Sequence, residues 1–186
     1  MKRIVLMLVS CMMVMSVMAQ NEHLKFMGIP LTGTITTFQT KLAAKGISYD
    51  KVASSQTESG VRCFKGVFSG EKANIYVYYN EKTKVVYRAK AVIEYPTEDI
   101  AKQNYSKFSS MLREKYITGD FVDSDHDDYP AIIIRVPNSK LEFYIGNIAL
   151  YLAKGSYSFL KERYLHIDYE DFDNSVSDMD NNMDDL

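Results

Sequence analysis

Apolar residues in this 186-residue chain switch twice from helical spacing to the alternation of strands. In the first helical segment, Ile35, Phe38 and Leu42 fall on one face of a helix. Thr34 precedes them as a suitable N-cap, and Gly46 follows as the residue type that readily ends a helix in the left-handed conformation. The pattern predicts a short helix between these two positions.

A second helical segment begins after Pro96. Thr97 is a suitable N-cap, and Glu98 and Asp99 carry negative charge where the helix dipole is positive. The apolar residues that follow share one face, which predicts a longer helix. These residues are Ala101, Tyr105, Phe108 and Leu112.

Strand patterns follow each helix. After the first helix, alternating runs occupy 61–68, 73–79 and 85–95, and short turn-forming segments separate them. After the second helix, four shorter runs read AIIIRV, KLEFYI, IALYLA and YLHIDYED. Such meanders predict the α+β class, with a curved antiparallel sheet that carries the two main helices on one face.

The chain is expected to form a single α+β domain over residues 20–174. The helix-plus-meander order occurs twice, so two fused repeats, 26–95 and 96–174, are an alternative. The segments FKGVF (64–68) and YIGNI (144–148) share an aromatic-x-Gly-x-apolar pattern that favours this alternative. The remaining identity between the halves is low, so the repeat stays open.

The first 19 residues have the composition of a signal peptide. Lys2 and Arg3 precede an apolar stretch that is too short to span a bilayer comfortably, and the tripeptide VMA at 17–19 suits signal peptidase. We expect cleavage before Gln20, a periplasmic or secreted protein, and no integral membrane segment after cleavage.

The two cysteines bear on this assignment. The segment LVSC, which ends at Cys11, resembles a lipobox, so a lipoprotein acylated at Cys11 is the alternative. The apolar residues 12–19 would then follow the lipid, where a polar tether is usual, and this favours the cleaved form. Cleavage leaves Cys63 alone and excludes an intramolecular disulfide. The strand-forming residues around Cys63 predict a small buried side chain.

Charge is unevenly distributed along the chain. The formal net charge is −2, yet residues 168–186 hold eight acidic side chains and no lysine or arginine. Residues 175–186 also lack regular apolar spacing, so they are interpreted as an acidic disordered tail. The chain is acidic as a whole and has no aromatic-plus-basic recognition motif, which argues against a nucleic-acid partner.

The tyrosine-rich segment NIYVYYNEKTKVVYRAKAVIEY raises the question of function. Alternation places Tyr76 and Tyr78 on one face of their strand, and Arg88 and Lys90 on the wet face of the next. Tyrosine forms strands readily, so one interpretation makes these rings sheet filler. The other interpretation is a surface for a protein or glycan partner, with these four side chains as the binding residues.

The motifs of common catalytic and cofactor sites do not occur in the sequence. The three histidines, His23, His126 and His166, are not part of any such motif. We therefore expect no cofactor and prefer a non-catalytic binding or protein-interaction module. The alternatives are a periplasmic hydrolase-like enzyme with an unidentified site and a structural surface protein.

The acidic segment GDFVDSDHDDYP is the one candidate for a metal site. Asp123, Asp125 and Asp127 offer carboxylates of the kind that calcium accepts. An EF-hand template fails, because Asp128 stands where glycine is needed and Ile134 where the bidentate glutamate belongs. A solvated acidic turn before an edge strand is the simpler interpretation, and weak calcium binding is the alternative.

Three segments carry a resemblance to known proteins: LKFMGIPLTGTITTFQTKLAAKG, FKGVFSG and VYYNEKTKVVYRAKA. Together they resemble small exported proteins of uncharacterised function that are common in the Bacteroidota. The pair of helix-plus-meander units is also similar in outline to the tandem-repeat fold of beta-lactamase inhibitory proteins, which bind protein partners on an open sheet face. Those repeats carry two short helices and a stapling disulfide, and this sequence shows neither clearly. The resemblance therefore implies a fold and assigns no functional residue.

Overall fold

The computed structural model describes residues 22–126, 129–155 and 163–175. The predicted signal peptide, Asp127 and the predicted tail beyond Ser175 therefore lie outside the described residues. In chain order the elements are β1 (Lys25–Phe26), β2 (Ile29–Pro30), α2 (Ile35–Ala43), β3 (Ser48–Tyr49), α3 (Lys51–Ser54), β4 (Val61–Phe68), β5 (Glu71–Tyr79), β6 (Val86–Tyr95), α4 (Glu98–Lys115), β7 (Asp120–His126), β8 (Tyr129–Pro137), β9 (Tyr144–Lys154) and β10 (Arg163–Asp171). Within these ranges, no helix is long and apolar enough to cross a bilayer.

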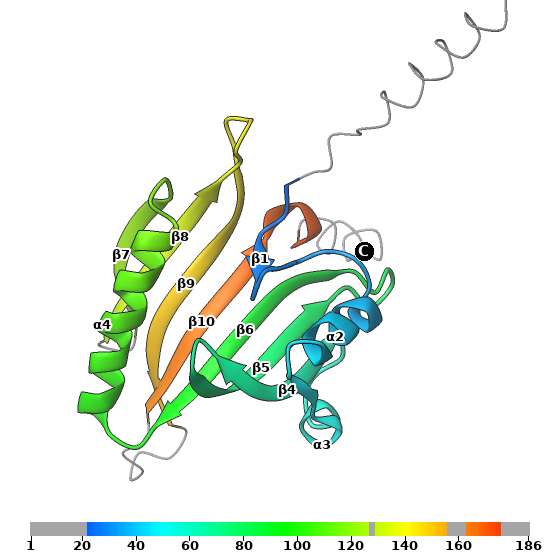
Figure 1. The fold of residues 1–186 in the computed structure, drawn as a ribbon, viewed down its shortest axis with the longest axis horizontal. Helices are drawn as coiled ribbons and strands as arrows, with labels where there is room; N and C mark the ends of the chain where they lie inside the picture. The colour runs from blue at the N-terminus through cyan, green and yellow to red at the C-terminus, as the bar shows by residue number, and fades with distance from the viewer. Residues whose placement is uncertain (1–21, 127–128, 156–162, 176–186) are drawn as a thin grey trace, which may run out of the picture.

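The eight strands β3 to β10 form one open sheet in the order β3-β4-β5-β6-β10-β9-β8-β7. Every neighbouring pair is antiparallel. Helices α2 and α4 lie on the same face of this sheet, α2 towards the β3 edge and α4 towards the β7 edge (Figure 1). The predicted α+β class, with an antiparallel sheet and two main helices on one face, is confirmed.

The strand order has a simple internal relation. The final strand of each half, β6 and β10, lies at the centre, and the first strand that each half contributes to this sheet, β3 or β7, lies at an edge. However, the two glycine motifs that suggested a repeat lie in β4 and β9, which do not occupy corresponding places in this order. The fused-repeat interpretation therefore stays a prediction.

The core lies between the helices and the sheet, and its composition explains the helix positions. Thr34 and Thr97 accept hydrogen bonds from Thr37 N–H and Ile100 N–H as N-caps, and Gly46 adopts φ +79°. The apolar helix faces then pack on alternate residues of the central strands, where small side chains admit them closely. Fully buried core residues include Phe38, Leu42, Ile75, Ala89, Ala91, Leu165 and Ile167.

The strands after α4 differ from the sequence prediction in one respect. The runs KLEFYI and IALYLA are not two strands, because β9 begins only at Tyr144 and then continues through Lys154. The residues before it form a turn, in which Asn138 Oδ1 accepts hydrogen bonds from Lys140 N–H at 2.8 Å and Leu141 N–H at 3.1 Å. An asparagine side chain that binds the following amides stabilises a turn over an extended strand.

The acidic segment before β8 is an edge strand, β7, and not the expected turn. It pairs with β8 from Asp120 to His126. Phe121 packs against the core, and Arg113 of α4 bridges to Asp123 at 2.5 Å. These contacts with α4 stabilise an extended conformation that the local sequence does not favour. Acidic side chains also discourage further strands from pairing with this edge.

Candidate functional site

The sheet face opposite α2 and α4, here called the outer face, is organised by strand register. Residues that alternate with the core positions point to this face, and antiparallel pairing aligns them into three rows across the sheet. Row A comprises Ser48, Lys65, Asn74, Val92, His166, Tyr151, Ala131 and Ser124. Row B comprises Cys63, Tyr76, Lys90, Asp168, Ala149, Ile133 and Val122. Row C comprises Val61, Tyr78, Arg88, Glu170, Asn147, Arg135 and Asp120.

The four binding residues predicted from the sequence lie together in rows B and C, and they are here called the aromatic–cation cluster. Tyr76 pairs with Lys90, and Tyr78 pairs with Arg88. The guanidinium carbon of Arg88 lies 4.9 Å from the ring centroid of Tyr78. Lys90 Nζ lies 5.7 Å from the ring centroids of both tyrosines. Cations at such distances are attracted to the aromatic ring, so the half-buried cluster is held together from within.

Asp168 on β10 holds the cluster in place. Its carboxylate accepts hydrogen bonds from Arg88 Nε at 2.9 Å and from Arg88 Nη2 at 2.5 Å. This two-point contact fixes the plane of the guanidinium and raises the pKa of Arg88. Sequence reasoning missed Asp168, which lies 80 residues from Arg88. The sequence did contain a signal for its position: Asp168 lies two residues from both His166 and Glu170, so the three side chains point to the same face of a strand.

Three rings from β7, β9 and β10 extend the outer face beside the cluster. The Tyr151 and His166 rings stack at 4.7 Å with an interplanar angle of 11°, and the His126 ring lies 4.5 Å from Tyr151. His166 lies on the outer face in row A but is half-buried, and its Nδ1 has no hydrogen-bond partner among the described residues. Burial lowers the pKa of His166 to about 4, so its ring is neutral at pH 7.

A hollow of about 880 Å³ opens where β4, β5 and β6 approach their ends. Lys65, Asn74 and Val92 of row A contribute to its lining, together with Lys72 and Glu94. Its walls therefore combine both signs of charge with apolar side chains such as Val67 and Val92. Lys65 is itself bound to Asp50 of the β3–α3 connection at 2.6 Å. The hollow borders the aromatic–cation cluster through row A and adds a polar margin to it.

Cys63 begins row B but is closed off from solvent. It is 3% exposed, and its backbone N–H donates to Ser54 Oγ of α3 at 2.8 Å. Burial raises the pKa of the Cys63 thiol, so the reactive thiolate is disfavoured. The prediction of a small buried side chain at this position is confirmed.

The residues proposed as calcium ligands do not form a cluster in the described part of the chain. Asp123 is engaged by Arg113, and Asp127 lies outside the described residues. Among the residues that the structure describes, no three His, Cys, Asp or Glu side chains are grouped closely enough to hold a metal ion. No geometric support for calcium binding therefore comes from Asp123 and Asp125.

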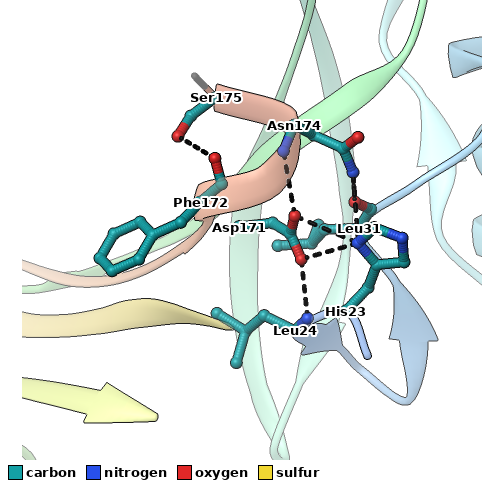
Figure 2. A network of polar contacts seen from close by, with 7 residues as sticks. All are labelled: His23, Leu24, Leu31, Asp171, Phe172, Asn174 and Ser175. Atoms are coloured by element: carbon teal, nitrogen blue, oxygen red, sulfur yellow. Dashed lines mark hydrogen bonds and ion pairs between the residues drawn. The ribbon is translucent and has the colours of Figure 1, made fainter. Parts of the chain in front are cut away.

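A second polar network fastens the N-terminal segment to the end of β10, on the helix side of the sheet (Figure 2). The fully buried Asp171 carboxylate accepts a hydrogen bond from Leu24 N–H at 2.8 Å and lies 3.1 Å from His23 Nδ1. Asn174 Nδ2 donates to the Leu31 carbonyl at 2.7 Å. Burial raises the pKa of Asp171 even though these donors oppose the shift. This N-terminal clasp joins distant parts of the chain, and its groups are directed at one another, which indicates a structural role.

Comparisons with known proteins return no match from family models, from curated proteins or from solved structures. The resemblance to exported Bacteroidota proteins and to beta-lactamase inhibitory proteins accordingly stays a prediction. Function must be argued from the outer face itself.

Proposed function

We propose that this chain is an exported, non-catalytic binding module that receives a protein or glycan partner on its outer face. The observation that carries the proposal is the aromatic–cation cluster, which gathers two tyrosines and two cations on the sheet face opposite α2 and α4. Tyrosine and arginine are among the residues that contribute most to binding at protein interfaces. An ordered, partly exposed group of both is therefore suited to recognition.

Preorganisation gives the proposal further support. Asp168 fixes Arg88 by two hydrogen bonds, and the Tyr78 ring lies against the same guanidinium. Tyr151 is likewise held by its stack with His166. Side chains that are already ordered lose little conformational entropy when a partner binds. The outer face thus offers rigid aromatic surface at low entropic cost.

A binding role fits these groups better than nucleophilic catalysis. The Cys63 thiol is buried and its pKa is raised, whereas a catalytic thiol needs a lowered pKa and access to substrate. Arg88 and Asp168 satisfy each other. The cluster therefore provides contact area and charge, and not a poised nucleophile with its base.

Export is the part of the proposal that rests on the sequence of residues 1–19. A short positive start, an apolar stretch and a small-residue cleavage signal belong to a protein that is secreted or retained in the periplasm. The partner is then to be sought in those compartments. Intact mass of the native protein tests this part: cleavage before Gln20 is expected, and a diacylated Cys11 start would replace it with the lipoprotein alternative.

The test of the binding face is a pull-down from periplasmic and secreted fractions, with wild-type protein and the Tyr76→Ala/Tyr78→Ala variant as baits. We expect the variant to stay folded and to lose at least about thirtyfold in affinity, or about 2 kcal/mol, for a partner that the wild type captures, as for a hot-spot pair. Tyr49→Ala is the control, because Tyr49 is an exposed tyrosine that pairs with the core residue Phe64 and so lies on the opposite side of the sheet.

Two results would count against the proposed face. A double variant that folds and binds as the wild type does would move the site elsewhere. A double variant that unfolds, as judged by thermal melting, would show that the rings serve the fold. The Tyr76→Phe/Tyr78→Phe variant then separates the two roles, since it keeps the rings and removes only the hydroxyl groups.

A further inference from the structure

Row B has a cationic, aromatic end and an apolar end. At the cationic end, Lys90 forms no ion pair with any described residue, and its Nζ lies 5.7 Å from the ring centroids of Tyr76 and Tyr78. Asp168, its cross-strand neighbour, already accepts two hydrogen bonds from Arg88. The charge of Lys90 therefore has no carboxylate of its own among the described residues, and the side chain is half-buried beside the two rings.

The apolar end of row B consists of Ala149, Ile133 and Val122, here called the apolar strip. Ile133 and Val122 are each 38% exposed, although they belong to adjacent strands and pair with each other. Ala149 continues the strip towards Asp168. An apolar side chain laid along this strip would be removed from water together with it, which is favourable in proportion to the area covered.

The distance between the two ends restricts what can contact both. Strands in a sheet lie roughly 4.8 Å apart, so Lys90 on β6 lies roughly 10 to 15 Å from the strip residues on β9 and β8. In an extended segment, residues i and i+4 point to the same side and lie about 13 Å apart. An extended segment that crosses the strands can therefore place one side chain at Lys90 and another on the strip.

We propose, resting on the proposed function, that the partner of the outer face is a protein that presents an acidic and an apolar side chain four positions apart in an extended segment. The carboxylate binds Lys90 beside the two tyrosine rings, and the apolar side chain covers Ala149 and Ile133, the part of the strip on β9 and β8. A carboxylate in this place gains a charge-assisted hydrogen bond in a partly desolvated setting. A neutral glycan would satisfy neither the free charge of Lys90 nor the apolar strip.

The probe is a phage-displayed library of random twelve-residue peptides, panned against the purified protein. Enriched peptides are expected to carry Asp or Glu with Leu, Ile, Val or Phe four positions away. Synthetic copies should bind at least fivefold more weakly to Lys90→Gln and to Ile133→Ser, and binding should weaken as salt is raised. Lys41→Gln is the matched control, because Lys41 is an exposed lysine on α2, over the opposite face. Thermal melting verifies that each variant is folded.

The outcomes separate this inference from the proposed function. Peptides whose binding needs Tyr76 and Tyr78 but is indifferent to Lys90 would overturn the inference and leave the binding face in place. Peptides whose binding is unaffected by substitution of Tyr76, Tyr78 or Lys90 would count against both the inference and the proposed binding face. A library without enriched sequences overturns the inference, and so does a glycan array on which binding requires the tyrosines, although the latter result supports the proposed face.

Discussion

Asp168 and Arg88 form a pair whose members depend on each other. Asp168 is 6% exposed, and both of its oxygens accept hydrogen bonds from the same guanidinium. Removing one member of such a pair is costly, because the other is left charged and partly buried without a partner. Arg88 also lies against Tyr78, so the position of that ring depends indirectly on Asp168.

We therefore expect Asp168→Asn to lower the free energy of unfolding by about 1–2 kcal/mol and to weaken partner binding at the same time. The amide replaces one acceptor oxygen with a donor that faces the guanidinium. Urea denaturation measures the first effect. Glu94→Gln is the control, since it neutralises an exposed acid on the neighbouring strand. Equal stability of the two variants would show that the pair contributes nothing to the fold.

His166 makes stability depend on pH in acid solution. Burial lowers its pKa from 6.5 to about 4, so the unfolded chain takes up a proton at a higher pH than the folded protein does. The stability associated with the neutral ring is fully present above pH 6.5 and is lost as the pH falls through 4. The loss is at most about 3.5 kcal/mol, because the pKa falls from 6.5 to about 4 and each pH unit corresponds to about 1.4 kcal/mol.

His166→Phe tests this, because phenylalanine keeps a ring against Tyr151 and cannot be protonated. Denaturation at pH 7 and pH 4 should show a smaller loss of stability for the variant than for the wild type. Carboxyl groups titrate in both proteins and lower the stability of each. The quantity to compare is therefore the fall in the free energy of unfolding between pH 7 and pH 4, measured for each protein. Parallel losses in the two proteins would mean that His166 is charged as easily in the folded state as in the unfolded one.

At the level of elements, the helices and the strands with regular alternation could be predicted from the sequence. Thr34 and Thr97 cap the helices as expected, and β4 has the predicted bounds Val61–Phe68. In these segments local propensity, capping and apolar spacing agree. Alternation also placed the four residues of the aromatic–cation cluster on one face, because side-chain direction follows from strand periodicity alone.

The remaining features depend on contacts between distant segments. The strand β7 reads as a loop, since its extended form is stabilised by Arg113 of α4 and by pairing with β8. The place of Asp168 beside Lys90 follows from the β6–β10 pairing, which no local pattern reveals. The burial of His166 likewise depends on its neighbours Tyr151 and Val92 on two other strands.

The N-terminal clasp joins the segment before β1 to the end of β10, and we expect its removal to release that segment. Asp171→Ala leaves the buried N–H of Leu24 without its acceptor, which should cost about 2 kcal/mol of stability. Asp171→Asn retains one acceptor oxygen and should cost less. Hydrogen exchange at Leu24 measures the release directly and should be faster in the alanine variant.

The exposed neighbour Asp173 supplies the control for the clasp, because Asp173→Ala removes the same charge from the same chain segment. Slow exchange at Leu24 in the Asp171→Ala variant would contradict the assignment of a fastening role. Fast exchange in both variants would attribute the effect to charge near the end of β10 and not to the hydrogen bonds.

At the level of the whole molecule, the fold separates the packed face of the sheet from the face on which we propose binding. Both main helices cover one face of the sheet, and the N-terminal clasp closes on that same side, so the core is completed there. The outer face is thus free to carry polar and aromatic side chains that the core does not need. Substitutions at Lys90 or Ile133 should accordingly change binding more than stability.

The final prediction concerns the C-terminal end of the domain. Asn174 binds the Leu31 carbonyl, and Ser175 is 8% exposed, so the domain extends through Ser175. Residues 176–186 are acidic and poor in apolar spacing, and we expect them to add little to the fold. Truncation after Ser175 should leave Tm within about 2 °C of the wild type, whereas truncation after Phe172 should lower it by about 3 °C or more.

The two truncated chains differ only in Asp173, Asn174 and Ser175, so a difference between their Tm values assigns the loss of stability to the contacts of these residues. A large drop after the first truncation would instead show that the acidic tail packs on the domain.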